Sequence, residues 1–369
     1  MKQMVYGLTA SMFLTLFLFS FIRNTGETKD EMAVIAYYAG DVKTIDNYDV
    51  QKLTHIIYSF CHLEGNKLKI DDKADSATIK KLVSLKKTNP RLKVLLSLGG
   101  WGGCEFCSPV FSTAKGRDEF ARSVKEANDY FKTDGIDLDW EYPAIEGHPG
   151  HAYLAADKPN FTALVKALRK SLGNKHEISF AAGGFPKFLE QSIEWKEVMA
   201  MVNYVNLMSY DLVNGNSTVT GHHTPLYSTE KQVESADQAV RYLRSIGVPA
   251  EKIVIGAAFY ARTWENVDSS NNGLYNKGKF KNFIAWHRFA QRLSKDEGFI
   301  FYTDSKAKAP YAYNPKTNVF ATFDDTNSIA AKTKYARQEG LKGIMFWELT
   351  LDKPSEGLLD VIHRVKHNK

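Results

Sequence analysis

Three acidic side chains alternate with apolar ones in residues 136–141. The alternating residues are Ile136, Asp137, Leu138, Asp139, Trp140 and Glu141. In a β-strand, side chains two residues apart point to the same side, so the three acids would share one face of the strand. Burying charge is unfavourable by several kcal/mol per ion, so an ordinary core strand does not carry such a row. The row therefore indicates a functional site, and an edge strand with one solvated face is the structural alternative.

Two kinds of chemistry use closely spaced carboxylates. A divalent cation binds carboxylate oxygens. Alternatively, crowding of the acids raises the pKa of at least one of them, which can then donate a proton near neutral pH. A glycosidase requires such a protonated acid at the leaving oxygen of the glycosidic bond. A metal-dependent phosphoryl-transfer enzyme is the weaker interpretation, because no phosphate-binding glycine loop or lysine accompanies the acids.

Short apolar runs alternate with helical patterns from Met32 onward, which is typical of β/α units around a parallel sheet. Eight runs predict strands, at residues 33–38, 55–61, 93–98, 136–141, 178–182, 202–210, 253–258 and 343–347. Helices are predicted at about 74–87, 115–132, 159–172, 229–246, 326–338 and 357–366. This order predicts an α/β fold, the closed (β/α)8 TIM barrel.

The regular spacing is interrupted after the seventh predicted strand. About 65 residues precede the next predicted helix, which is more than a barrel loop requires. The segment contains aromatic and turn-rich runs and a helical pattern near 283–293. We therefore expect a small α+β insertion domain at residues 262–325, within a catalytic barrel that spans residues 30–369.

Aromatic and polar residues follow the predicted strands, where barrel enzymes place their active sites. These residues are Tyr37, Phe60, Trp101, Tyr142, Tyr210, Asp211, Tyr260, Arg262 and Trp347. Each alone is more often a packing residue than a functional one. Together they suit a sugar cleft, because pyranose rings stack their CH faces on aromatic rings while hydroxyl groups bind polar side chains.

The acidic row and the strand ends resemble family 18 glycoside hydrolases, the chitinase family. Residues 134–141 resemble the family signature D-G-x-D-x-D-W-E. Ser97-Leu98-Gly99-Gly100 resembles the S-x-G-G motif of the third strand, and Met208-Ser209-Tyr210-Asp211 resembles the M-x-Y-D motif of the sixth. Tyr260-Ala261-Arg262 resembles the Y-x-R that follows the seventh strand, and Trp347 resembles the tryptophan at the floor of the site. The resemblance extends from about residue 33 to residue 349 and includes the insertion.

This resemblance implies a chitinase that hydrolyses β-1,4 bonds between N-acetylglucosamine units with retention of configuration. Glu141 would protonate the glycosidic oxygen, and the acetamido oxygen of the sugar would attack its own anomeric carbon to form an oxazolinium ion. Asp139 would orient the acetamido N–H and offset the developing positive charge. Asp137 would share a proton with Asp139, and Tyr210 would hydrogen-bond the acetamido group.

The resemblance also implies a set of substrate-binding residues and a partner. The set is Tyr37, Phe60, Gly100, Trp101, Tyr142, Met208, Asp211, Arg262 and Trp347. The expected partner is chitin or its oligosaccharides, and neither a metal ion nor an organic cofactor is implied. Family members have cis peptide bonds at positions that correspond here to Ser59–Phe60 and Trp347–Glu348.

Two other activities are compatible with the same barrel. An endo-β-N-acetylglucosaminidase that acts on glycoprotein glycans uses the same acidic row. Some family members are lectins that bind chitin without cleaving it, but these usually lack the acid, whereas Glu141 is present.

Composition suits one large globular unit, since 44% of the 369 residues are apolar and 24% are charged. The net charge is +6, and no Lys/Arg block is dense enough for nucleic-acid binding. Residues 1–25 carry a largely apolar run that predicts a signal peptide, with an uncleaved N-terminal membrane anchor as the alternative. We expect an exported protein, secreted or periplasmic, that is a monomer and meets a membrane only if this segment is retained.

Cysteines and histidines complete the sequence analysis. Cys104 and Cys107 are spaced for a tight disulfide, or for a zinc site if further ligands lie nearby, and Cys61 lies in an apolar run typical of a buried free thiol. The pairs His222-His223 and His148 with His151 lack a carboxylate or cysteine partner in register. They are predicted to be loop histidines and not metal ligands.

Overall fold

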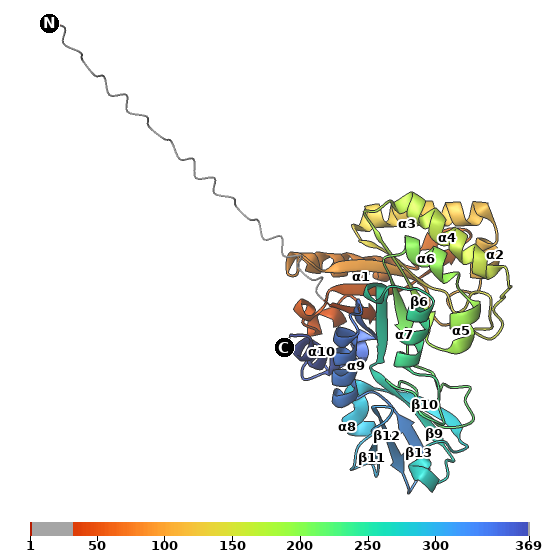
Figure 1. Ribbon diagram of the computed structural model, residues 1–369, viewed down its shortest axis with the longest axis vertical. Coiled ribbons are helices and arrows are strands. Elements are labelled where there is room, and N and C mark those ends of the chain that lie inside the picture. The colour runs from red at the N-terminus through yellow and green to blue at the C-terminus, as the bar shows by residue number, and fades with distance from the viewer. Residues whose placement is uncertain (2–31, 368–369) are drawn as a thin grey trace. The chain divides into compact units, whose positions relative to one another are not determined.

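The computed structural model describes Met1 and residues 32–367 (Figure 1). The predicted signal peptide or anchor at residues 1–25 lies, apart from Met1, outside the described residues. Among the helices in the described part, none is long and apolar enough to cross a membrane.

Eight parallel strands within the described residues form a closed barrel. They are β1 (Ala33–Tyr38), β2 (His55–Glu64), β4 (Lys93–Gly99), β5 (Gly135–Asp139), β6 (Glu177–Gly183), β7 (Tyr204–Met208), β8 (Ile253–Ala258) and β14 (Gly343–Trp347). The barrel closes because β1 pairs in parallel with both β14 and β2. The short strand β3 (Lys67–Lys69) extends β2 as an antiparallel hairpin. The predicted (β/α)8 barrel is confirmed.

Helices cover the outside of the barrel (Figure 1). They are α1 (Lys73–Ser84), α2 (Cys107–Phe111), α3 (Ala114–Phe131), α4 (Asp157–Leu172), α5 (Pro186–Gln191), α6 (Trp195–Met201), α7 (Ala236–Ser245), α9 (Thr326–Gln338) and α10 (Leu358–His367). The prediction of a helix from residue 229 was wrong at its start. Ser235 caps α7 by accepting a hydrogen bond from the backbone N–H of Gln238, so the helix begins at Ala236.

Strand β5 has an apolar outer face and an acidic inner face. Ile136, Leu138 and Trp140 belong to the apolar layer between the strands and the helices. The Trp140 ring lies 5.7 Å from that of Phe111 in α2 and 6.3 Å from that of Phe161 in α4. Because β5 pairs with β4 on one side and β6 on the other, it is a central strand, and its acids point into the barrel.

A second, antiparallel sheet lies between β8 and α9 and forms the insertion expected after the seventh strand. Its strands are β9 (Tyr260–Glu265), β10 (Lys279–Ala285), β11 (Ile300–Asp304), β12 (Ala309–Asn314) and β13 (Val319–Thr322), in the order β10-β9-β13-β12-β11. Figure 1 shows this sheet and the short helix α8 (Phe289–Arg292) gathered at one side of the barrel. The helical pattern near 283–293 was correct only in part, because residues up to Ala285 pair with β9 as strand β10.

Candidate active site

The predicted site residues meet at the C-terminal ends of the barrel strands. Asp137 and Asp139 lie on β5, and Glu141 follows two residues after this strand ends. Tyr210 and Asp211 follow β7, Arg262 lies on β9, and Trp347 is the last residue of β14. The barrel topology thus brings together residues as far apart in the chain as Asp137 and Trp347, which are 210 positions apart.

Asp137 is fully buried and is held by hydrogen bonds from four neighbours in the described part of the barrel. The Tyr37 hydroxyl and the Ser97 hydroxyl each donate to Oδ2 at 3.0 Å. The Ser179 hydroxyl donates to Oδ1 at 2.6 Å, and the Asn206 amide donates to the same oxygen at 3.1 Å. Burial raises the pKa of Asp137, and these donors oppose the shift by stabilising the carboxylate.

Asp139 lies above Asp137 and is almost completely buried, yet its Oδ1 has no hydrogen-bond partner among the described residues. Burial, followed by the charges of Glu141 and Asp137, raises the pKa of Asp139 well above its usual range. A buried carboxyl oxygen without a partner is unfavourable. This oxygen is therefore available to a polar group of a bound ligand, such as an amide N–H.

Glu141 is the acid at the barrel mouth and is partly exposed. Burial raises the pKa of Glu141 to about 7, and the negative charge of Asp211 adds to the shift, while a hydrogen bond with Tyr142 opposes it. A carboxyl group with this pKa is largely protonated just below neutral pH. Glu141 can therefore act as a general acid under ordinary conditions.

Asp211 forms a bidentate ion pair with Arg262. The Arg262 Nε–H donates to Oδ1, and Nη2–H donates to Oδ2 at 2.5 Å. This pairing, together with the His223 imidazole 3.4 Å from Oδ1, holds the pKa of Asp211 well below its usual range. The guanidinium carbon also lies 5.6 Å from the centre of the Tyr260 ring. Asp211 therefore stays ionised, and its charge raises the pKa of Glu141.

An aromatic floor lies beside the acids. The Trp347 ring stacks on Phe60 with centroids 5.5 Å apart and planes 13° apart, and it lies 5.9 Å from Tyr37. Gly100 makes room for Phe60, since a Cβ at Gly100 would overlap the Phe60 ring, and its φ of 78° lies in the left-handed region. Its backbone N–H donates to the carbonyl of Asp139 at 2.9 Å. Met208 and Tyr210 belong to the same buried cluster as Tyr37, against which Trp347 packs.

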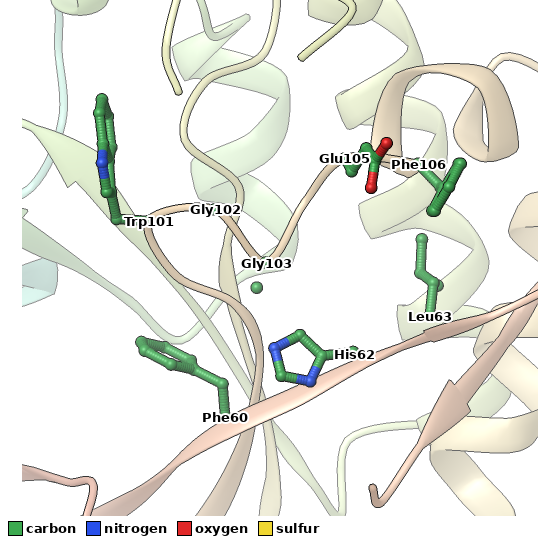
Figure 2. A pocket seen from close by; sticks show the side chains of 9 residues that line it. Phe60, His62, Leu63, Trp101, Gly102, Gly103, Glu105 and Phe106 are labelled. Carbon is green, nitrogen blue, oxygen red and sulfur yellow. The ribbon is translucent and has the colours of Figure 1, made fainter. Parts of the chain in front are cut away.

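Trp101 lies at the edge of a side pocket and not on this floor. The pocket has a volume of about 420 Å³ and is lined by Phe60, His62, Leu63, Gly99, Trp101, Gly102, Gly103, Glu105 and Phe106. Figure 2 shows Phe60 and Trp101 on one side of the pocket and Leu63 and Phe106 on the other. The Trp101 side chain is 54% exposed and contacts His148 at a ring distance of 5.4 Å. An exposed indole beside a pocket can stack on a sugar ring.

Cysteine pairing follows one of the two alternatives in the sequence. Cys104 and Cys107 form a disulfide, with Cα atoms 5.0 Å apart, in the loop that carries Trp101. Cys61 is a buried free thiol, as predicted. In residues 32–367, no group of three or more His, Cys, Asp or Glu side chains is arranged to hold a metal ion.

Several residues that the sequence analysis missed support the acidic row. Ser179 and Asn206 donate hydrogen bonds to Asp137. Asn206 could have been identified from the sequence, because it is a polar amide in the otherwise apolar strand β7. The prediction that His222 and His223 lack a carboxylate partner was wrong, since His223 lies 3.4 Å from Asp211 and His222 lies 3.1 Å from Asp304. Each carboxylate is 12 or more residues away in the sequence, so spacing gave no signal. The expected cis peptide bonds at Ser59–Phe60 and Trp347–Glu348 are present, and Glu141–Tyr142 is a further one.

Comparison with known proteins shows that this barrel is that of a glycoside hydrolase. The family model of glycosyl hydrolases family 18 matches residues 33–352. The chain belongs to this family.

Two curated relatives and one solved structure illustrate the similarity. Chitinase A1 of Niallia circulans is 32% identical over 76% of this chain. The match covers only 44% of the length of Chitinase A1. Chitotriosidase-1 of Mus musculus is 30% identical over 82% of this chain and 68% of its own length. The structure of a family 18 N-acetylglucosaminidase from Paenibacillus barengoltzii superimposes with a TM-score of 0.83 at 34% identity, covering 90% of this chain and 99% of that one.

Proposed function

We propose that this protein is a chitinase that cleaves β-1,4 bonds between N-acetylglucosamine units and acts outside the cytoplasm. The observation that carries the proposal is the division of the acidic row into three environments. Asp137 is satisfied by four donors, Asp139 has a buried oxygen without a partner in the described chain, and Glu141 has a pKa of about 7. The names of the two curated relatives support the substrate class.

The proposed reaction proceeds with retention of configuration by substrate-assisted catalysis. Glu141 donates its proton to the glycosidic oxygen as the bond to the leaving sugar breaks. The acetamido oxygen of the sugar attacks the anomeric carbon and forms an oxazolinium ion. The Asp139 carboxylate accepts a hydrogen bond from the acetamido N–H and offsets the positive charge of this ion. Water then attacks the anomeric carbon, and Glu141 recovers a proton from that water. The oxazolinium ring opens and regenerates the acetamido group, whereas the sugar ring stays closed.

Asp137 supports Asp139 in this scheme. The two acids are adjacent on the inner face of β5, and the charge of Asp137 contributes to the raised pKa of Asp139. One proton shared between them keeps the pair singly charged before the reaction. Tyr210 hydrogen-bonds the acetamido group, and the aromatic floor of Trp347, Phe60 and Tyr37 supports the distorted sugar.

A second candidate, favoured by the name of the Paenibacillus structure, is an N-acetylglucosaminidase with the same site. The sequence analysis considered one such enzyme, an endo-β-N-acetylglucosaminidase, which would cleave the chitobiose core of glycoprotein glycans. A non-catalytic lectin is disfavoured, because Glu141 is present and has the pKa of a general acid.

Product analysis separates these candidates. The purified protein is incubated with N-acetylglucosamine oligomers and, separately, with a glycopeptide that carries a chitobiose core, and the products are identified by mass spectrometry. A chitinase releases short oligomers from the first substrate and leaves the second intact. Cleavage of the glycopeptide alone would replace the proposal with the second candidate.

Product configuration tests the mechanism itself. NMR of the first product should show the β configuration, and a thiazoline analogue of the oxazolinium ion should inhibit because it resembles the intermediate. Fully deacetylated chitosan should not be cleaved, since it lacks the attacking oxygen. An α-configured first product, or a glycosyl ester trapped on Asp139 or Glu141, would contradict substrate-assisted catalysis.

A further inference from the structure

His223 is a buried histidine in the connection between β7 and α7. It has no exposed surface, and its backbone is held on two sides. Its N–H donates to the Thr322 hydroxyl of β13 at 3.1 Å, and its carbonyl accepts from the N–H of Leu212 at 3.0 Å. These contacts join the connection to the insertion sheet and to the residue next to Asp211. The imidazole is therefore held in a defined place.

The side chain of His223 faces the Asp211 carboxylate. Nδ1 lies 3.4 Å from Oδ1, the same oxygen that accepts from Arg262 Nε. The Asp211 side chain is 32% exposed, whereas the His223 side chain is not exposed. The guanidinium thus binds both carboxylate oxygens, the imidazole lies against Oδ1, and the carboxylate keeps a partly exposed surface.

The surroundings of His223 favour a neutral imidazole with its hydrogen on Nδ1. The charged and titratable groups that face it are Asp211, Arg262 and Tyr260, with Asp324 beyond them. Asp324 is paired with Lys332 at 2.6 Å. Both ring nitrogens are buried, and neither makes a hydrogen bond of ordinary geometry to a described residue. Nδ1 lies 3.4 Å from the Asp211 carboxylate, and no such ion-pair contact to Nε2 is found in the described chain, so a hydrogen on Nδ1 is the better satisfied of the two. Burial accordingly lowers the pKa of His223.

We propose that His223 is a positioning residue, which holds Asp211 against Arg262 and thereby moderates the negative charge that Glu141 experiences. This inference rests on the proposed function, in which Glu141 is the general acid. Donation from Nδ1–H withdraws charge from Oδ1, so Asp211 raises the proton affinity of Glu141 less than an unshielded carboxylate would. The hydrogen bond also fixes the orientation of the exposed part of the carboxylate toward the substrate.

The adjacent residue provides a matched control. His222 is equally buried, but its Nε2 lies 3.1 Å from Asp304 of β11 and not near Asp211. His223→Phe keeps the ring and removes the donor to Asp211, and His222→Phe makes the same change one residue away. A general loss of packing affects both variants, whereas a change in the charge at Glu141 affects only the first.

The test measures kcat/KM against pH on a chitin oligosaccharide for both variants and the wild type. His223→Phe should move the basic limb upward by roughly 0.3 to 1 pH unit. KM should also rise in this variant, because Asp211 is less well held. His222→Phe should keep the basic limb of the wild type. His223→Gln retains an N–H donor, so its basic limb should lie much closer to that of the wild type than the limb of His223→Phe does. A basic limb in His223→Phe that matches the wild type would overturn the inference.

A second measurement requires neither a variant nor activity. Nitrogen-15 NMR of the imidazole in the wild-type protein distinguishes the two neutral tautomers. We expect a hydrogen on Nδ1 from pH 6 to pH 8. A hydrogen on Nε2 would overturn the inference even if the protein cleaves chitin. Failure to cleave any N-acetylglucosamine substrate, with the Nδ1 tautomer present, would instead count against the proposed function.

Discussion

Asp137, Asp139 and Glu141 are the same kind of group in three different environments. Asp137 is surrounded by donors, Asp139 is buried with an oxygen that lacks a partner in the described chain, and Glu141 lies at the mouth near the charge of Asp211. Neighbours, and not residue type, decide which group stays charged and which keeps its proton. The proposed roles follow from that difference.

Replacing Glu141 by Gln keeps the shape of the side chain and removes its transferable proton. We expect turnover on chitin oligosaccharides to fall by at least about 100-fold, with little change in oligosaccharide affinity. Steady-state kinetics and calorimetric titration with an oligomer measure the two quantities. Turnover within a few-fold of the wild type would remove Glu141 from the role of general acid.

The pH dependence of activity should show the pKa of Glu141. Because the acid must be protonated, activity should fall as the pH rises through about 7, the value to which burial and Asp211 raise the pKa of Glu141. Asp211→Asn removes a neighbouring negative charge and leaves Arg262 without its carboxylate partner. Both changes favour ionised Glu141, so the basic limb should move to lower pH. An unchanged or raised limb in this variant would show that Asp211 does not act on Glu141.

The loop between β4 and α2 presents its tryptophan to solvent, whereas strand β9 buries its own. Trp101 is 54% exposed, and Trp264 is fully buried in the insertion domain. Trp101→Ala should raise KM on chitin oligomers by roughly 3- to 10-fold through lost stacking, with little change in stability. Trp264→Ala should reduce the free energy of unfolding by about 3 to 5 kcal/mol. Urea unfolding and kinetics on both variants separate the two roles.

If Trp101→Ala destabilises the protein and leaves KM unchanged, the loop tryptophan is a packing residue. The sugar would then lie elsewhere on the barrel mouth. Trp347→Ala provides a second test on the floor of the same site, because Trp347 stacks on Phe60 at the end of β14.

Stability of the whole molecule should depend on pH through the active site. Burial raises the pKa of Glu141 from 4.5 to about 7, so the folded protein binds this proton more tightly than the unfolded chain. The contribution is favourable below 4.5 and is lost as the pH rises from 4.5 to about 7. Glu141→Gln removes the penalty for ionising a partly buried acid. Its free energy of unfolding should exceed that of the wild type by about 1 to 3 kcal/mol at pH 8.

The comparison at low pH is the control for this prediction. At pH 4 the glutamate is largely protonated in both states, so the difference between the variant and the wild type should nearly vanish. Urea unfolding at the two pH values measures it. An equal difference at pH 4 and pH 8 would indicate a packing effect of the substitution and not the ionisation of Glu141.

Much of the architecture was predictable from local patterns. Alternation in residues 136–141 placed the acids on one face, because side chains of a strand alternate strictly between its two sides. Eight apolar runs separated by helical patterns predicted the barrel, and the long interval after β8 predicted the insertion. The start of α7 and the strand character of residues 283–285 were missed, because a serine cap and pairing with β9 override local propensity.

The electrostatic state of the site was decided only by the tertiary structure. The sequence by itself determined which acids share a face, since that depends on spacing along one strand. It did not determine that Ser97, Ser179 and Asn206 surround Asp137, or that His223 and Arg262 share one oxygen of Asp211. These partners come from separate strands and loops, and a pKa depends on burial and on charges within a few ångströms. Such distances exist only once the barrel has closed.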